Sequence, residues 1–163
     1  MTFYKALFSI LFISIILCSC GNSGKESGKN KQSEEVTETK PTLPNLPEEK
    51  FNSLKSSCDL IDFIFFDLPI SMSQDNQKSI QQVLGFFDAG QVNHSGNCKA
   101  IARVFFNGEG ESLMEADLFF TQGCMYFVFY SEGQPKWSNR INAVGQNFFQ
   151  QVISSAQAAH KAQ

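Results

Sequence analysis

The chain has 163 residues, of which 42% are hydrophobic, 13% are aromatic and 18% are charged, with a formal net charge of -3 at pH 7. Acidic and basic residues are mixed along the sequence and form no basic stripe of the kind that neutralises phosphates, which argues against nucleic acid as a partner. The length predicts one globular domain behind an N-terminal export signal.

The first twenty residues have the pattern of a bacterial export signal. Lys5 precedes an apolar stretch over residues 6–17, which is too short to span a bilayer core that needs about 20 residues. The tetrapeptide Leu17-Cys18-Ser19-Cys20 then resembles the lipobox of bacterial lipoproteins, in which an aliphatic residue and two small residues precede the modified cysteine. The resemblance implies a signal peptide over residues 1–19 and a diacylglyceryl group, with palmitate-type acyl chains, on Cys20.

The same resemblance implies a location in the bacterial cell envelope. Gly21 stands where an aspartate would favour retention in the inner membrane, so the expected site is the outer membrane, on its periplasmic or its surface side. Two or more acyl chains make such an association effectively permanent, since each buried methylene contributes about 0.8 kcal/mol. The alternative is an ordinary cleaved signal peptide with two incidental cysteines.

Residues 20–49 are predicted to be the lipidated cysteine and a disordered tether. This stretch is rich in Gly, Ser, Lys, Glu and Pro and has almost no large apolar side chains, so it cannot bury enough surface to offset the entropy lost on ordering. The alternative is that its mixed charges bind a specific ligand. Residues 50–163 are then expected to form a single α+β domain.

The domain is expected to open with two helices. Over residues 51–67 the apolar positions recur at three- and four-residue steps, which predicts a mostly buried helix ended by Pro69. A second helix is expected to begin near Ser71 or Ser73, either of which can cap it, and to end at Gly90.

Three alternating runs follow, beginning at Cys98, Leu113 and Cys124, and the turn-forming residues between them favour an antiparallel meander. Ser138 is expected to cap a third helix, in which Gly145 marks a close approach of another segment. The predicted fold is therefore αα-βββ-α, an α+β arrangement of two N-terminal helices, a three-stranded antiparallel meander and a C-terminal helix.

The expected strand register divides this sheet into a buried face and a mixed face. Pairing Thr121 with Cys124 at the second turn sets the register, and the mixed face then carries aromatic side chains around a cross-strand pair of Arg103 and Asp117. Exposed apolar patches tend to mark interaction sites, so this face is the candidate partner surface, while cover by a helix is the alternative. The candidate residues are Ile101, Arg103, Phe105, Asp117, Phe119, Tyr126, Val128 and Tyr130.

Three cysteines remain after processing: Cys58, Cys98 and Cys124. An odd number in an oxidising compartment implies at most one disulfide and a spare thiol. The expected register puts Cys98 and Cys124 on opposite faces, so a disulfide between Cys58 and Cys98 is predicted, which closes a loop of about 40 residues. Three reduced cysteines that pack as small hydrophobes are the alternative.

No catalytic motif is recognisable, so the chain is not expected to be an enzyme. His94 and Cys98 are four residues apart, but a metal site needs three or four ligands and the other histidine, His160, lies near the C-terminus, so no metal or cofactor is predicted. Two functions are considered. One is a membrane-anchored lipoprotein that binds an unknown envelope protein through the mixed face, and the other is a carrier of an apolar ligand in a Phe-lined pocket.

Overall fold

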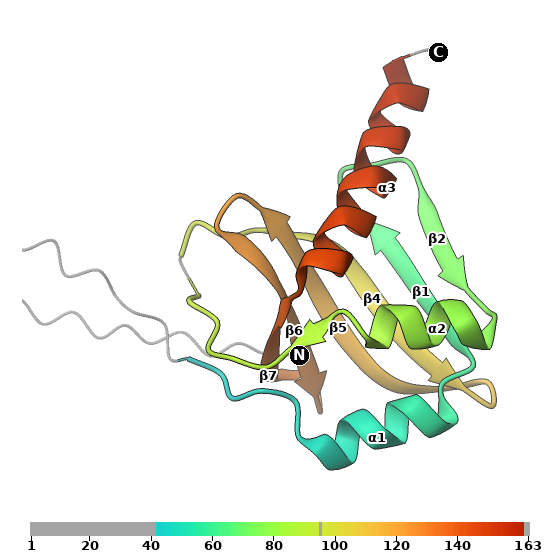
Figure 1. Cartoon of the computed structure of the whole chain (residues 1–163), viewed down its shortest axis with the longest axis vertical. Coiled ribbons are helices and arrows are strands. Elements are labelled where there is room, and N and C mark those ends of the chain that lie inside the picture. The colour runs from blue at the N-terminus through green and yellow to red at the C-terminus, as the bar shows by residue number, and fades with distance from the viewer. Residues whose placement is uncertain (1–41, 95, 162–163) are drawn as a thin grey trace, which may run out of the picture. The chain divides into compact units, whose positions relative to one another are not determined.

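The computed structural model describes residues 42–94 and 96–161, so the predicted signal peptide, Cys20 and most of the predicted tether lie outside the described residues. The described part contains three helices and seven strands (Figure 1). In chain order they are α1 (Glu48–Ser57), β1 (Leu60–Phe65), β2 (Ser71–Gln74), α2 (Gln77–Leu84), β3 (Phe87–Asp88), β4 (Ala100–Gly108), β5 (Glu111–Thr121), β6 (Cys124–Ser131), β7 (Gln134–Ile141) and α3 (Ala143–Lys161).

The strands form one antiparallel sheet that curls into a half-barrel, in the order β2-β1-β4-β5-β6-β7-β3 (Figure 1). Strands β4 to β7 are a meander, the β1–β2 hairpin extends it on one side, and the short β3 pairs with β7 on the other. All three helices contribute buried side chains to the core on the same side of the sheet, which we call the inner face. The opposite side is the outer face.

The αα-βββ-α prediction is wrong. The helix expected over residues 51–67 is divided between α1 and β1, and the expected second helix is divided between β2 and α2. In β1, Ile61 and Phe63 are fully buried whereas Ile64 is exposed, which is the two-residue period of a strand. A short apolar run of this kind satisfies the helical and the strand periods alike, and pairing with β4 decides for the strand.

The second helix also begins and ends elsewhere than predicted. Ser71 and Ser73 lie in β2, and α2 is capped by Asn76, whose Oδ1 accepts a hydrogen bond from the backbone N–H of Ser79 at 2.9 Å. The helix ends with Gly85 as its C-terminal cap, five residues before the predicted Gly90.

The third helix begins later than predicted, because Ser138 lies inside β7. Asn142 takes the capping role, and its Oδ1 accepts a hydrogen bond from the backbone N–H of Gly145 at 3.0 Å. The prediction that Gly145 marks a close approach is confirmed. A Cβ at this position would lie 2.7 Å from Phe86 and from Ile141, closer than non-bonded carbons approach one another.

Two pairings predicted for the central hairpins are confirmed: Thr121 pairs with Cys124, and Arg103 pairs with Asp117. The register of β4 with β5 is not regular along its length, because it shifts between Ala100 and Ala102 and again between Phe106 and Asn107. Both turns have glycine at positive φ, 81° at Gly110 and at Gly123, as tight hairpins require. The hairpin between β6 and β7 turns at Glu132-Gly133, also at positive φ, and is absent from the predicted meander.

Phe149 of α3 lies at the centre of the core. Its ring centroid is 5.7 Å from that of Phe63, 5.8 Å from that of Phe86 and 6.0 Å from that of Phe127, and all four side chains are fully buried. Each such side chain contributes about 1.5–3 kcal/mol by leaving water. The rings that an apolar ligand would have to contact therefore already pack against one another.

Candidate functional site

The outer face carries rows of side chains that run across the strands. In one row Arg103 stands between Ile64 and Asp117, and in the next Phe105 stands between Asp62 and Glu115. The row beyond Arg103 begins at Phe66, whose N–H donates to the carbonyl of Ile101. The outer face comprises Ser71 and Ser73 of β2, Asp62 and Ile64 of β1 with Phe66 after it, Arg103 and Phe105 of β4, Glu115, Asp117 and Phe119 of β5, and Tyr126, Val128 and Tyr130 of β6.

The part of the outer face over β6 is covered by the chain itself. Leu43 and Val92 pack against Tyr126 and Val128, and both of the β6 side chains are buried. Phe119 of β5 extends this cluster, because its ring stacks on that of Tyr126 with 4.6 Å between centroids. This part of the outer face is therefore covered, as the alternative reading of the sequence proposed, but the cover consists of loop segments and not of a helix.

One covering segment, residues 43–46, belongs to the stretch that the sequence assigns to the tether. The backbone N–H of Ser138 in β7 donates to the carbonyl of Pro44 at 2.8 Å, and Asn45 Nδ2 donates to the carbonyl of Ser138, also at 2.8 Å. Asn45 further exchanges two hydrogen bonds with Gly90, both of 3.0 Å. These bonds tie the segment to β7 and to the loop after β3.

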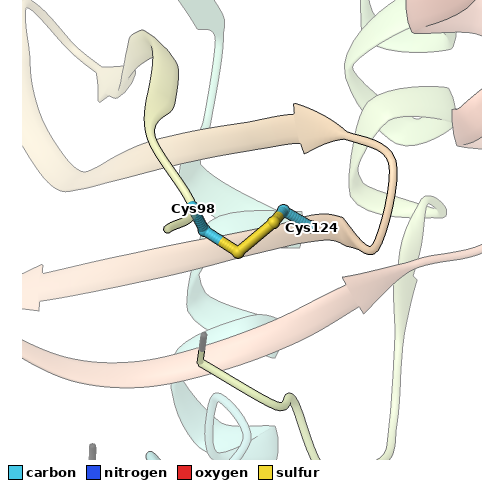
Figure 2. The surroundings of a disulfide bond; sticks show 2 residues. All are labelled: Cys98 and Cys124. Atoms are coloured by element: carbon cyan, nitrogen blue, oxygen red, sulfur yellow. A yellow bond between two sulfur atoms is a disulfide. The ribbon is translucent and has the colours of Figure 1, made fainter. Parts of the chain in front are cut away.

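The second covering segment carries Val92, and a disulfide fixes the chain a few residues after it. Figure 2 shows Cys98, which precedes β4, bonded to Cys124 at the start of β6, with 5.8 Å between their Cα atoms. The predicted Cys58–Cys98 disulfide is wrong, and Cys58 is a buried free thiol whose Sγ donates to the carbonyl of Leu60. Strand alternation did not apply to Cys98 because β4 begins only at Ala100.

The centre of the outer face is a network around Arg103. Its Nε lies 2.7 Å from Asp117 Oδ1, and its Nη1 lies 3.1 Å from Glu115 Oε2. The guanidinium carbon lies 4.6 Å from the ring centroid of Tyr130, whose hydroxyl donates to Asp117 Oδ2 at 2.6 Å. Asp117 is only 8% exposed, whereas the side chains of Arg103 and Glu115 are partly exposed. The Arg103–Asp117 contact is an ion pair, since Asp117 Oδ1 accepts no hydrogen bond. Hydrogen bonds from Arg103 to Glu115 and from Tyr130 to Asp117 join β4, β5 and β6.

This network changes the acidity of the tyrosine. Burial, the hydrogen bond to Asp117 and the negative charge of that carboxylate together raise the pKa of Tyr130 to about 12. Tyr130 is therefore a stable hydrogen-bond donor at physiological pH, and it holds the Asp117 carboxylate in place beneath Arg103.

The part of the outer face over β1 and β4 is open and apolar. Ile64 is 49% exposed and Phe66 is 53% exposed, and they are two of the four large apolar side chains that are exposed in the described part of the chain. Phe105 beside them is half-buried. Sequence reasoning missed Ile64 and Phe66 because it placed them in a helix. The apolar run of β1 fits the helical and the strand periods alike, so the sequence carried no decisive signal for these two positions.

Seven of the eight residues of the predicted partner surface lie on the outer face, and the eight differ in accessibility. Ile101 is the exception, because it lies at the register shift between Ala100 and Ala102 and packs against the inner core cluster. Asp117, Tyr126 and Val128 are buried and cannot contact a partner while the covering segments stay in place. The remaining five are half-buried: Ile101, Arg103, Phe105, Phe119 and Tyr130.

The other polar residues considered from the sequence do not form a metal site within the described part of the chain. No three His, Cys, Asp or Glu side chains in this part of the chain are placed to hold a metal ion. His94 Nε2 lies 3.2 Å from Ser138 Oγ, and its ring is edge-on to Tyr126. A surface pocket of about 400 Å³ lies beside the start of α3, where Arg140 is paired with Asp88 at 2.8 Å.

None of the helices within residues 42–94 and 96–161 combines the length and apolarity needed to cross a membrane. Comparisons with protein families, with curated proteins and with solved structures found no match to this chain. The outer face combines an exposed apolar patch at Ile64 and Phe66 with a charged network around Arg103.

Proposed function

We propose that this protein is a lipoprotein of the bacterial cell envelope, anchored to the outer membrane by acyl chains on Cys20, and that its domain binds another envelope protein through the outer face. Support for the anchor comes from the lipobox-like tetrapeptide Leu17-Cys18-Ser19-Cys20 after a short apolar stretch. Acyl chains of this kind hold a domain at a membrane without a membrane-spanning helix.

The observation that carries the binding role is the exposure of Ile64 and Phe66 beside Phe105. Leaving such side chains in water forgoes about 1.5–3 kcal/mol each, and contiguous patches of this kind are uncommon on surfaces that bind nothing. Arg103, which lies between the row of Phe66 and the row of Phe105, adds a side chain that is enriched in protein interfaces.

Photo-crosslinking in the intact envelope tests the binding role. A photoreactive phenylalanine analogue replaces Phe66 or Phe105 in the full chain, and a specific protein adduct is expected at both positions. The matched control replaces Val144, which is 61% exposed but lies on α3, on the helical side of the sheet. Equal adducts at Val144, or none at the two outer-face positions, would contradict the proposal.

Metabolic labelling tests the anchor separately. Radiolabelled palmitate is expected to label the wild-type chain, and Cys20→Ser is expected to lose both the label and the membrane association. Cys58→Ser is the control for a cysteine elsewhere, and it should retain both. A Cys20→Ser protein that stays in the membrane fraction would refute anchoring through this residue.

A further inference from the structure

The two edges of the sheet differ in how their main chains are covered. At the β3 edge, Asn45 exchanges two hydrogen bonds with the main chain of Gly90, and Asn139 Nδ2 donates to the carbonyl of Asp88 at 3.3 Å. At the other edge, the main chain of β2 is hydrogen-bonded to β1, and no other segment within residues 42–94 and 96–161 is bonded to it. Every second residue of an edge strand points its N–H and C=O away from the sheet, so β2 offers main-chain groups to a further strand.

We propose that β2 binds an extended segment of a partner protein as an additional strand, and that this segment presents Lys or Arg and aliphatic side chains at alternate positions over the outer face. The inference rests on the proposed function, because it names the binding mode and the chemistry of the partner. Strand addition of this kind derives affinity from main-chain hydrogen bonds and specificity from every second side chain.

The side chains of β2 leave room for such a segment. On the outer face β2 carries only Ser71 and Ser73, which pair with Ile64 and Asp62 of β1. Both serines are exposed. Neighbouring strands lie about 4.8 Å apart, so a long side chain on an added strand crosses one small serine and reaches β1. An aliphatic side chain opposite Ser71 then covers the exposed Ile64, and a cationic one opposite Ser73 approaches Asp62.

Asp62 selects a cation because its own charge is not neutralised. Its carboxylate accepts hydrogen bonds from Ser73 Oγ at 2.5 Å and from Asn107 Nδ2 at 3.4 Å, both neutral donors. The ion pairs found among the described residues do not include it. Phe105 stands next to Asp62 and has Glu115 on its other side. A cation that reaches Asp62 therefore meets an unpaired carboxylate, whereas Glu115 lies two strands further across the sheet and is already paired with Arg103.

The same charges argue against a second copy of this chain as the occupant of β2. The outer face has three carboxylates, those of Asp62, Glu115 and Asp117, and the single guanidinium of Arg103. Pairing two β2 strands edge to edge would place two such acidic faces side by side, whereas a basic segment from another protein compensates the charge. We therefore assign the edge to a partner of opposite charge.

A peptide probe tests the inference on the full lipidated chain in detergent micelles. The probe is a fluorescent peptide of sequence Lys-Thr-Ile-Thr-Lys-Thr-Ile, which as a strand places Lys and Ile on one face. Fluorescence anisotropy is expected to show saturable binding to the wild type. Asp62→Asn removes the charge and keeps the size and one acceptor oxygen, which can still accept from Ser73 Oγ, and it should weaken binding about fivefold, as for an ion pair at a surface. Asp62→Lys should abolish binding.

Matched controls separate strand addition from non-specific attraction. Glu132→Lys makes the same charge change in the exposed β6–β7 turn, and it should leave the affinity unchanged. A probe N-methylated at alternate residues loses main-chain donors but keeps its charges, and it should not bind. A probe with Glu in place of Lys should not bind either. Circular dichroism shows whether each Asp62 variant is folded. If Asp62→Lys alone fails to fold, the affinity of Asp62→Asn for the probe still tests the inference.

Three results would overturn the inference. One is equal binding of the N-methylated probe, another is unchanged affinity of Asp62→Asn, and the third is crosslinking of a photoreactive residue at Ser73 to a second copy of the chain. The outcome is separable from that of the proposed function. If adducts form at Phe66 and Phe105 but the probe does not bind, the outer face still binds a protein and the strand-addition mode alone is wrong. If neither occurs, both proposals fail.

Discussion

Removing the Cys98–Cys124 disulfide is expected to destabilise the protein by a predictable amount. The bond joins residues 26 positions apart, and the chain-entropy relation for a loop of about that length gives a loss of about 3.5 kcal/mol at 25 °C. The double substitution Cys98→Ala with Cys124→Ala frees the segment that carries Val92 across the outer face. Since most of the effect arises in the unfolded chain, packing around Phe149 should not change.

Urea unfolding followed by the fluorescence of Trp137, the single tryptophan, measures this loss. Wild-type protein in dithiothreitol should match the double variant, and the double variant should not respond to dithiothreitol. Cys58→Ala is the control for a buried cysteine outside the disulfide, and its stability should still depend on the reductant. A loss below about 1 kcal/mol, well under the usual effect of a native disulfide, would refute the reasoning.

Three further predictions use the same unfolding assay or the intact protein. Gly145→Ala should lower the free energy of unfolding by about 1–3 kcal/mol, because the new Cβ would lie 2.7 Å from Phe86 and the helix has to shift; an unchanged midpoint would show that α3 packs differently. Folding raises the pKa of Tyr130 from 10.0 to about 12, so its contribution to stability is complete below pH 10 and is lost as pH rises toward 12. Tyr130→Phe should therefore lose less stability than the wild type between pH 10 and pH 12, and parallel curves would contradict this. Burial raises the pKa of the Cys58 thiol, so iodoacetamide should modify it only after unfolding, and rapid labelling of the native protein, read by intact mass, would place that thiol at the surface.

The central hairpins were predictable because the information that sets them is local. Glycine in a two-residue turn allows positive φ, and that turn aligns the strands on either side, so the pairing of Thr121 with Cys124 follows from the order of residues. The Glu109-Gly110 turn aligns Gly108 with Glu111, and Arg103 comes to lie opposite Asp117 only because the register shifts by one residue between Phe106 and Asn107. Glu132-Gly133 carries the same signal as Glu109-Gly110. Applied there, the same reasoning would have found β7 and moved the start of α3 beyond Ser138.

The segment from Leu60 to Phe65 shows where local information ends. Its apolar residues fit a helix as well as a strand, and the choice depends on whether the neighbouring strand offers free main-chain groups. Here β4 does, about 40 residues further along the chain. Ile64 and Phe66 form an exposed patch only because this segment folds as a strand and not as a helix.

The amino-acid sequence by itself determined the positions of the two central turns, the pairing of Thr121 with Cys124 and the glycine required where α3 crosses Phe86, since each depends on neighbours in the chain or on the size of one residue. Tertiary structure alone decided the partner of Cys98, the cover over Tyr126 and the open edge at β2. These depend on which distant segments come to lie side by side, and such proximity results from the packing of the whole core.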